Sequence, residues 1–572
     1  MKKTLLLLLY LFSTLVACAK QTIVSTASEI NNGSWIAGDT LVMKNGTWTN
    51  QSILLKGAGT ELQPIVLLAE TPGDVILTGT SKLGFSGKYV IVSGLFFKNG
   101  TLSGSDIISF RTSSSELAEN CALTNSAIVN YNPSVNTVDS KWVSIYGKNN
   151  KVDHCSFENK TNSGTLMVVW LVNGVTVNHS ITQNYFGYRN SNLDATGAEL
   201  NGQEIIRVGD SGTSMTTASV TVQGNFFEHC NGEIEIISNK SCGNYYSNNV
   251  FLECHGMLTL RHGNGCTVDG NYFFGNGISE SGGVRLIGEN HKVYNNYFEK
   301  LRGTGYRSAI CIVRGKLNSL SNEYFQVKNA LVAFNTMVDC TESFCINYNS
   351  STTCTMPPIE TVIAHNNVYN TSTSNINIDV DQTDAAMDIT WRNNLINLGK
   401  YTNFTYTSTQ VITGKDPKLS LAGTSINMSE PITGSALINF PTTDYPEIIT
   451  DIRGRDRGTT AKLPGASQLS GTITRVMPTK TGAGATFFNL IGTGLNEQIQ
   501  STVFKAYISG HRLKTSVSIS GKLNIFDING KCLYQQLLTS GITTAPFAKK
   551  GIYILCFNTN IGEHYSQKVI IN

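Results

Sequence analysis

Two glutamates and a lysine lie close together in the segment NGEIEIISNKS, residues 231–241. Glu233 and Glu235 are separated by one isoleucine, in an apolar stretch that is typical of a strand. Residues two apart on a strand point to the same face, so we expect the two carboxylates to lie side by side. Like charges placed that close repel each other unless a cation or a proton lies between them. Paired carboxylates with an amide oxygen nearby suit Ca²⁺, which prefers oxygen ligands.

Two basic residues follow the glutamates. Lys240 is the second-last residue of the same segment, and Arg261 lies in LTLRHGNG, where an apolar strand meets a glycine-rich turn. A cation beside the glutamates would neutralise the carboxylate of a uronate sugar and acidify the hydrogen on the adjacent carbon. A neutral lysine can remove that proton, and a second basic residue can protonate or stabilise the departing glycosidic oxygen. The residue types therefore predict β-elimination, which activates no water.

The basic residues recur at nearly one position of a repeat. Lys240, Arg261 and Arg285 each follow an aromatic residue of the sequence repeat described below by a similar number of residues. This spacing predicts that the three basic side chains form one column on one face. Taken singly, Lys240 would be interpreted as an ordinary solvated lysine, and the two glutamates as exposed charges. The isoleucines that flank the glutamates argue against this interpretation. His262 is expected to point to the opposite strand face unless the turn re-aims it, and we treat it as a candidate substrate contact.

A short phrase of Asn followed by two aromatic or apolar residues returns along the chain. Strong copies begin at Asn184, Asn225, Asn249, Asn271 and Asn296, and weaker copies at Asn335, Asn367 and Asn394. Spacings in the low twenties, with short strands and Gly/Asn turns in each repeat, predict a right-handed parallel β-helix. We expect the asparagines to stack as a ladder at one corner. Longer gaps between copies predict inserted loops that wall a binding cleft.

The N-terminus has the pattern of an export signal. Lys2 and Lys3 precede TLLLLLYLFSTLV, an apolar run too short for a typical membrane-spanning helix. The run ends in LVAC, which resembles a bacterial lipobox with Cys18 as the lipidated residue, although Ala17-Cys18-Ala19 also fits a signal-peptidase site. We therefore expect an exported protein, secreted or associated with the outer membrane or cell surface. A lipid anchor on Cys18 would be its one contact with a membrane.

Composition excludes several classes of protein. A net charge of +3, with 15% charged residues, argues against a nucleic-acid binder or a polybasic membrane surface. The 13 cysteines include no CxxC pair, so a structural zinc site is not expected. Most of them should be small buried residues. Cys340, Cys345 and Cys354 cluster in a loop-rich stretch that could include a disulfide.

The sequence divides into four parts. Residues 1–19 form the export signal, residues 20–468 the β-helix and residues 469–495 a Gly/Thr-rich linker. Residues 496–572 alternate like strands around an NG turn and predict a small C-terminal antiparallel β-sandwich. The phrases FDINGK and KGIYIL in this last part resemble the sorting domain of the type IX secretion route. That resemblance implies the secretion machinery as a partner.

The segment GEIEIISNKS, with RHG beginning 21 residues after the lysine, resembles polysaccharide lyase family 6. This is the β-helix family of alginate lyases and chondroitinase B-type enzymes, and the resemblance spans about residues 20–465. It implies that Glu233 and Glu235 are Ca²⁺ ligands, Lys240 the Brønsted base and Arg261 the Brønsted acid. Asn201, in ELNGQEIIRVG, matches the third ligand of the family, and Arg207 matches the arginine on the strand that follows.

The stretch GGVRLIGENHKVYNNYFEKL resembles the alginate-cleaving branch of the family. There an arginine on the coil after the catalytic one binds a uronate carboxylate, and Arg285 matches it. Alginate has one carboxylate per sugar and no sulfate, which suits single guanidinium groups. Three alternatives stay open: a chondroitinase B-type lyase acting on dermatan sulfate, a β-helix glycoside hydrolase that uses the two glutamates, and a non-catalytic surface protein that binds glycans.

Overall fold

The structure is a computed structural model of the chain. It describes residues 19–488, apart from 103, 195, 198, 350, 421–425 and 459–460, and then residues 504–509, 512–517, 520–527, 532–544, 551–559 and 564–571. Residues 1–18 lie outside the described part, so the export signal and lipidation at Cys18 stay predictions. The chain forms two compact units, Met1–Leu490 and Ile491–Asn572, which we describe separately.

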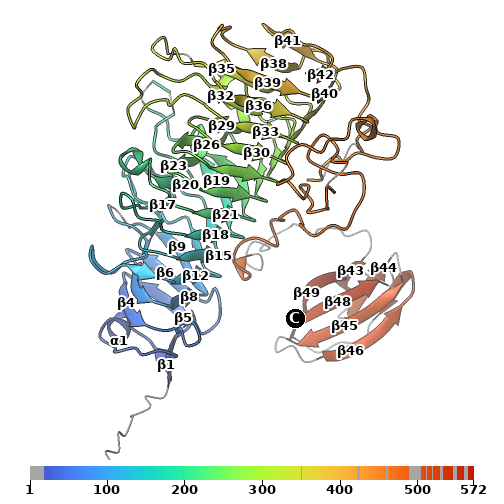
Figure 1. Cartoon of the computed structure of the whole chain (residues 1–572). Coiled ribbons are helices and arrows are strands. Elements are labelled where there is room, and N and C mark those ends of the chain that lie inside the picture. The colour runs from blue at the N-terminus through green and yellow to red at the C-terminus, as the bar shows by residue number, and fades with distance from the viewer. Residues whose placement is uncertain are drawn as a thin grey trace, which may run out of the picture. The chain divides into compact units, whose positions relative to one another are not determined.

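The first unit is a right-handed parallel β-helix, as predicted (Figure 1). Three parallel sheets of fourteen strands run its length over the described residues, and each full coil gives one strand to each sheet. Sheet A comprises β1 (Gln21–Val24), β2 (Thr40–Met43), β5 (Ile65–Ala69), β8 (Val90–Ser93), β12 (Ala122–Thr124), β15 (Lys151–Asp153), β18 (Ser180–Thr182), β21 (Thr221–Gln223), β24 (Tyr245–Ser247), β27 (Thr267–Asp269), β30 (Lys292–Tyr294), β33 (Leu331–Ala333), β36 (Thr361–Ala364) and β39 (Ile389–Arg392). A single short helix, α1 (Ala27–Asn31), precedes β2 among the described residues.

Two further sheets complete the coils. Sheet B comprises β3 (Gly46–Thr49), β6 (Val75–Gly79), β9 (Leu95–Gly100), β13 (Ala127–Val129), β16 (Ser156–Glu158), β19 (Tyr185–Asn190), β22 (Phe226–Asn231), β25 (Val250–Leu252), β28 (Tyr272–Phe274), β31 (Tyr297–Glu299), β34 (Thr336–Val338), β37 (Asn367–Tyr369), β40 (Asn394–Asn397) and β42 (Val411–Ile412). Sheet C comprises β4 (Ser52–Ala58), β7 (Lys82–Lys88), β10 (Ile108–Ser109), β11 (Ala118–Glu119), β14 (Val143–Ile145), β17 (Met167–Val169), β20 (Ile206–Gly209), β23 (Glu235–Lys240), β26 (Gly256–His262), β29 (Ser281–Leu286), β32 (Ile310–Val313), β35 (Glu342–Tyr348), β38 (Ile376–Val380) and β41 (Lys400–Thr402).

Identical side chains stack inside the β-helix. Phenylalanines of successive coils lie face to face, for example Phe227 on Phe251 and Phe251 on Phe273, with ring centroids 4.7 and 4.6 Å apart. The predicted asparagine ladder is confirmed: each buried amide donates to the Oδ1 atom of the next, as Asn249 does to Asn271 (2.9 Å). One rung was assigned wrongly, because the ladder passes through Asn366 and not through its neighbour Asn367.

Residues 475–488 lie against the β-helix and are called the strap. Arg475 pairs with Asp269 (3.2 Å) and Lys480 with Glu228 (2.6 Å). Further along, the Ala485 backbone N–H donates to Ser156 (2.9 Å) and Phe487 packs on Phe96. The described part of the predicted linker 469–495 therefore contacts several coils.

The second unit is antiparallel, as predicted. Its described strands form two sheets, β43 (Phe504–Ser509), β44 (Arg512–Val517) and β47 (Gly541–Thr544) in one, and β45 (Gly521–Asp527), β46 (Cys532–Leu538), β48 (Gly551–Thr559) and β49 (His564–Ile571) in the other. Over the described residues, no helix has the length and apolar character needed to cross a membrane.

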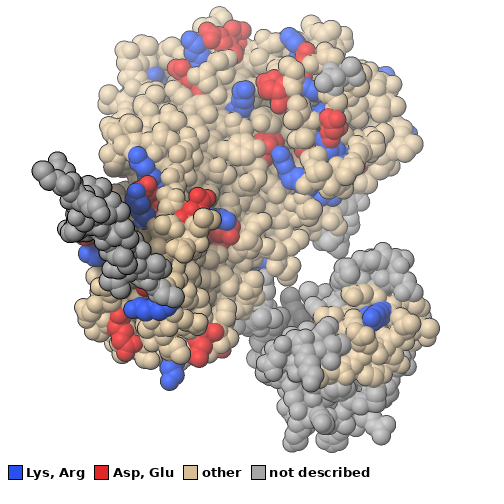
Figure 2. All heavy atoms as spheres, turned by 60° about the horizontal axis from the view of Figure 1, so that its bottom comes forward, with Lys and Arg blue, Asp and Glu red and all other residues tan. Residues whose placement is uncertain are grey.

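Charge and cysteine use agree with the sequence analysis. Basic and acidic side chains are interspersed on the face shown in Figure 2, without a continuous basic surface. Cys155, Cys230 and Cys254 are buried and free, as expected of small core residues. Cys340, Cys345 and Cys354 are also free, so the disulfide suggested for this cluster does not form.

Candidate active site

All seven predicted site residues line one cavity of about 510 Å³ on sheet C, around β23, β26 and β29: Asn201, Glu233, Glu235, Lys240, Arg261, His262 and Arg285. Ser211, Tyr306, Asn322 and Tyr324 also line it, and they come from connections between strands. Those four residues gave no signal in the sequence, because loop shape decides which of them reach the cavity. The strands bring the predicted set together.

The two predicted glutamates have different surroundings. Arg285 Nη2 and the Ser238 hydroxyl both donate to the carboxylate of Glu235, and Arg261 Nε lies 3.8 Å from the same group. Glu233 Oε1 is buried and accepts no hydrogen bond, whereas its Oε2 faces the Gly202 backbone N–H (3.3 Å). That N–H also donates to Asn201 Oδ1 (2.8 Å). Gly202 therefore holds the amide oxygen of Asn201 beside Glu233.

A third carboxylate, which the sequence analysis missed, completes the acidic group. Glu204 is 2% exposed, accepts a hydrogen bond from Thr165 (2.6 Å) and lies 3.9 Å from Lys240 Nζ. Burial, together with the nearby charges of Glu204 and Glu235, raises the pKa of Glu233 to about 9. The sequence does not single out Glu204, because residues 201 to 207 contain no second acidic residue with which it would form a recognisable pair. Its place at the site follows only from the register between adjacent coils.

These residues fit a hard divalent cation. The unpartnered Glu233 oxygen is buried among carboxylates, where a cation would remove the repulsion between them. Carboxylate and amide oxygens are the ligands that Ca²⁺ prefers. Asn201, Glu233 and Glu235 would hold the ion, with Glu204 beside them.

The raised pKa of Glu233 has a measurable consequence for stability. A group whose pKa is higher in the folded chain stabilises the fold below its unfolded pKa and loses that effect as pH rises through its folded pKa. We therefore expect the melting temperature of the Ca²⁺-free protein to fall between about pH 4.5 and about pH 9. Added Ca²⁺ should raise the melting temperature most at the alkaline end, because metal binding needs ionised ligands. A Ca²⁺ shift of equal size at both ends would contradict this.

Arg261 and His262 both face the cavity because of a β-bulge. The register between β23 and β26 shifts between Asn239 and Lys240, so that Lys240 lies opposite His262 and Arg261 is the extra residue. Arg261 donates to the Glu323 backbone carbonyl (2.7 Å) and to His262 Nε2 (2.9 Å). Its guanidinium also lies 4.4 Å from the Tyr324 ring centroid. The sequence places His262 on the opposite face unless it is re-aimed locally, and the bulge re-aims it into the cavity.

His262 is held in its neutral form. Its side chain is 2% exposed, and its pKa is lowered to about 3, mainly by burial and further by the positive charges of Arg261 and Lys240. A neutral imidazole can accept a hydrogen bond or contact a sugar, but adds no positive charge to the cavity.

The predicted single basic column is also corrected. Arg285 lies opposite Thr259, which in turn lies opposite Ser238, whereas Lys240 occupies a position two residues further along its strand. The same row continues from Ser238 to Arg207. Arg285 therefore shares a register with Arg207, three coils earlier, and not with Lys240. Spacing from an aromatic marker cannot show this, because a bulge changes the count within a strand.

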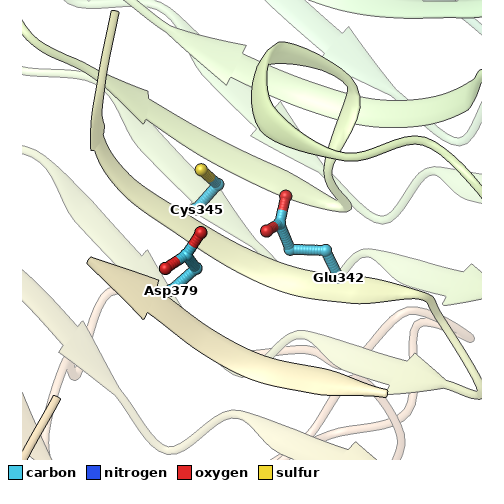
Figure 3. A group of neighbouring side chains, drawn as sticks. All are labelled: Glu342, Cys345 and Asp379. Atoms are coloured by element: carbon cyan, nitrogen blue, oxygen red, sulfur yellow. The ribbon is translucent and has the colours of Figure 1, made fainter. Parts of the chain in front are cut away.

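A second acidic cluster lies on β35 and β38, two and three coils beyond β29 (Figure 3). Glu342 and Cys345 of β35 face Asp379 of β38, with their possible ligand atoms within 4.8 Å of one another. Burial raises the pKa of Glu342 to about 7, and its carboxylate accepts the Gly305 backbone N–H (2.6 Å). A thiol between two carboxyls is a poor ligand set for Ca²⁺. The contact instead fixes the loop that carries Tyr306, whose ring lies 5.2 Å from the Arg285 guanidinium.

Comparisons with known proteins agree with this geometry. A family model described as chondroitinase B matches residues 24–435. The solved structure of AlyGC, a PL6 family alginate lyase, is 34% identical with a TM-score of 0.64, over 70% of this chain and 54% of that one. A mannuronic acid specific family 6 lyase from human gut microbiota is 27% identical with a TM-score of 0.60, over 68% of this chain and 92% of that one.

A third solved relative, the PL6 family lyase Pedsa3628 from Pseudopedobacter saltans, is 27% identical with a TM-score of 0.57, over 68% of this chain and 94% of that one. The chain thus spans 54% of the length of AlyGC and nearly all of the two smaller lyases. No curated protein matches the chain. Because the family model covers most of the sequence and the solved relatives share its fold, the chain belongs to the chondroitinase B family of polysaccharide lyases.

Proposed function

We propose that the protein is a Ca²⁺-dependent lyase that cleaves alginate by β-elimination and leaves unsaturated oligosaccharides. The observation that carries the proposal is the meeting of Lys240 and Arg261 with the carboxylates of Glu233 and Glu235 in one cavity, with the buried Glu204 beside Lys240. Two of the solved relatives are described as acting on alginate or on mannuronic acid, which supports a uronate substrate. Lys240, Arg261 and the oxygen ligands Asn201, Glu233 and Glu235 are the residues that would carry the reaction.

The reaction follows from the positions of the basic side chains. Bound Ca²⁺ would neutralise the uronate carboxylate and so acidify the hydrogen on the adjacent carbon. Lys240, in its neutral form, accepts that proton, and the electron pair of the broken C–H bond forms a double bond in the sugar ring. The glycosidic C–O bond breaks, and Arg261, acting as the Brønsted acid, donates a proton to the departing oxygen. The 20% exposure of the Lys240 side chain lets its proton pass to solvent afterwards.

Two contacts favour a substrate with one carboxylate per sugar and argue against a glycoside hydrolase. The Arg285 guanidinium lies 5.2 Å from the Tyr306 ring centroid and presents one cationic group to the cavity, which suits one carboxylate per sugar. Glu235 is bonded to Arg285 and Ser238 and lies beside Arg261. A carboxylate so engaged is poorly suited to the proton transfer that a glycoside hydrolase requires.

We also propose that the protein is exported to the cell surface or the medium. The basic and apolar N-terminal segment supports export, and the resemblance of the C-terminal unit to a sorting domain supports delivery by the secretion machinery. Detection of the full chain on intact cells or in the culture medium would test this. Retention of the chain inside the cell would contradict it.

The test of the proposed reaction measures the unsaturated product by its absorbance in the near ultraviolet. The substrates are alginate, its mannuronate and guluronate blocks, and dermatan sulfate. We expect the absorbance to rise with alginate, to stop after exhaustive chelation and to return with Ca²⁺ but not with buffer alone. Product from dermatan sulfate alone would support the chondroitinase B-type activity instead. New reducing ends without absorbance would indicate hydrolysis, and binding without cleavage would indicate a glycan-binding protein.

A further inference from the structure

A second cavity, of about 480 Å³, lies on sheet C on the N-terminal side of the candidate active site. Arg111, Tyr146 and Trp170 line it, on the coils of β10, β14 and β17. None of these residues belongs to the cavity around Lys240. Strand β20 lies between the strands that carry the two cavities.

The aromatic residues stand in line with the base. Ile145 pairs with Val169 and Val169 with Val208, so Tyr146, Trp170 and Gly209 follow at one position of successive coils. Gly209 pairs in turn with Lys240. Gly209 has a φ of +81° and a Cβ atom there would lie 2.6 Å from the Lys240 carbonyl oxygen, so glycine is required. The row therefore runs from Tyr146 through Trp170 and Gly209 to Lys240. At Gly209, the position between Trp170 and Lys240, there is no side chain.

Four side chains form a continuous stack along this row. Arg111 Cζ lies 3.8 Å from the Tyr146 ring centroid, and the Tyr146 and Trp170 rings are stacked at 6.0 Å with 9° between their planes. On the far side, Arg207 Cζ lies 5.4 Å from the Trp170 ring centroid. The Trp170 Nε1 atom donates to Ser144 (3.1 Å), which fixes the indole. The stack holds one guanidinium group at each end.

Both guanidinium groups have donors to spare. Within the described residues, neither the Arg111 nor the Arg207 side chain makes a hydrogen bond or an ion pair, and Arg207 Nε is buried without an acceptor. The acidic residue at this cavity, Glu119, pairs with Lys88 (3.3 Å), and Lys148 lines the cavity as well. The side chains that line the cavity therefore carry a net positive charge, and Asp106 lies near enough to Arg111 to interact with it electrostatically without forming an ion pair.

We propose that this stack is a distal binding site for the polyuronate chain, so that the polymer lies along the axis of the β-helix from β10 to β29. The inference rests on the proposed function. With a rise of about 4.8 Å per coil, Arg111 and Arg207 lie roughly 14 Å apart along the axis, and Arg207 and Arg285 are again three coils apart. A polymer with one carboxylate per sugar can meet these regularly spaced guanidinium groups, each of which binds a carboxylate strongly. The aromatic edges supply apolar contact to the sugar rings.

The test compares long and short substrates in Arg111→Ala and Trp170→Ala variants. Loss of one charge-assisted hydrogen bond corresponds to about a tenfold change in binding. We therefore expect KM for polymeric alginate to rise about tenfold more than KM for an alginate trisaccharide, which is too short to reach from Lys240 to Arg111. Arg392→Ala is the matched control, because it removes an exposed guanidinium from β39 of sheet A, which pairs with Asp444 (3.1 Å).

The outcomes separate this inference from the proposed function. If the wild-type protein cleaves no uronate polymer, the proposed function fails. If it cleaves alginate, and both variants keep the wild-type ratio of KM values for polymer and trisaccharide, the distal site is wrong. Trp170→Phe keeps a ring in the stack and should give an intermediate ratio. Thermal melting identifies a variant that fails to fold, in which case Trp170→Phe and Arg111→Ala decide the question.

Discussion

Replacing Lys240 with alanine should lower turnover on alginate by about 10²–10⁴-fold, the usual effect of removing a positioned base. Lys240 is the lysine of the cavity, with its ammonium 3.9 Å from Glu204 and its strand position fixed by pairing with β20 and β26. Alanine leaves Arg261, Arg285 and the oxygen ligands in place. Binding of oligosaccharide should therefore persist, and the loss should appear in kcat.

The Lys240→Arg variant is the matched comparison. It keeps the positive charge, but a guanidinium stays protonated at any accessible pH and cannot act as a base. Turnover by Lys240→Arg should therefore be no better than that by Lys240→Ala. If either variant turned over substrate like the wild type, the base would lie elsewhere, and neutral His262 would be the next residue to test.

Replacing Glu235 with alanine should both destabilise the protein and abolish its activity. Arg285 is 3% exposed, and its one anionic partner among the described residues is Glu235. Removing one member of a buried ion pair leaves a buried charge uncompensated, which costs about 3–5 kcal/mol of folding free energy. The same change removes a proposed Ca²⁺ ligand, so added Ca²⁺ should restore neither activity nor melting temperature. Thermal melting and product absorbance, each with and without Ca²⁺, measure both effects.

Glu228→Ala is the control for this prediction. Glu228 is a buried carboxylate on β22 of sheet B that pairs with Lys480 and accepts a hydrogen bond from Tyr185 (2.7 Å). Its removal should lower the melting temperature but leave cleavage and the Ca²⁺ response unchanged. A Glu235→Ala protein that stays as stable as the wild type, or regains activity with Ca²⁺, would contradict the role assigned to Glu235.

The fold and much of the candidate site could be predicted because the β-helix repeats. One asparagine and one phenylalanine recur in each of the central coils, so the phrases at Asn225, Asn249 and Asn271 indicate where coils begin. Glu233 and Glu235 could be recognised as a pair because they are neighbours in the sequence. Nothing more than strand spacing was needed for either inference.

The parts that could not be predicted depend on contacts between coils. The bulge at Arg261 arises from how β26 pairs with β23, and it places His262 in the cavity. Arg285 pairs with Thr259, ahead of the bulge, and so lies in the row of Ser238 and not in that of Lys240. Glu204 approaches Lys240 only because their coils are adjacent. Tyr324, which packs on Arg261, belongs to an inserted loop whose path no repeat determines.

The strap changes how the β-helix can unfold. In a solenoid each coil contacts only its neighbours, so coils can in principle come apart one after another from an end. The strap joins Asp269 on β27 to Phe96 on β9, with contacts to Glu228 and Ser156 between them. A coil in this stretch cannot separate without also releasing contacts several coils away. The strap thereby couples the coils that carry Arg111, Lys240 and Arg261 into one cooperative unit, so the whole length of the proposed polymer path should persist or be lost together.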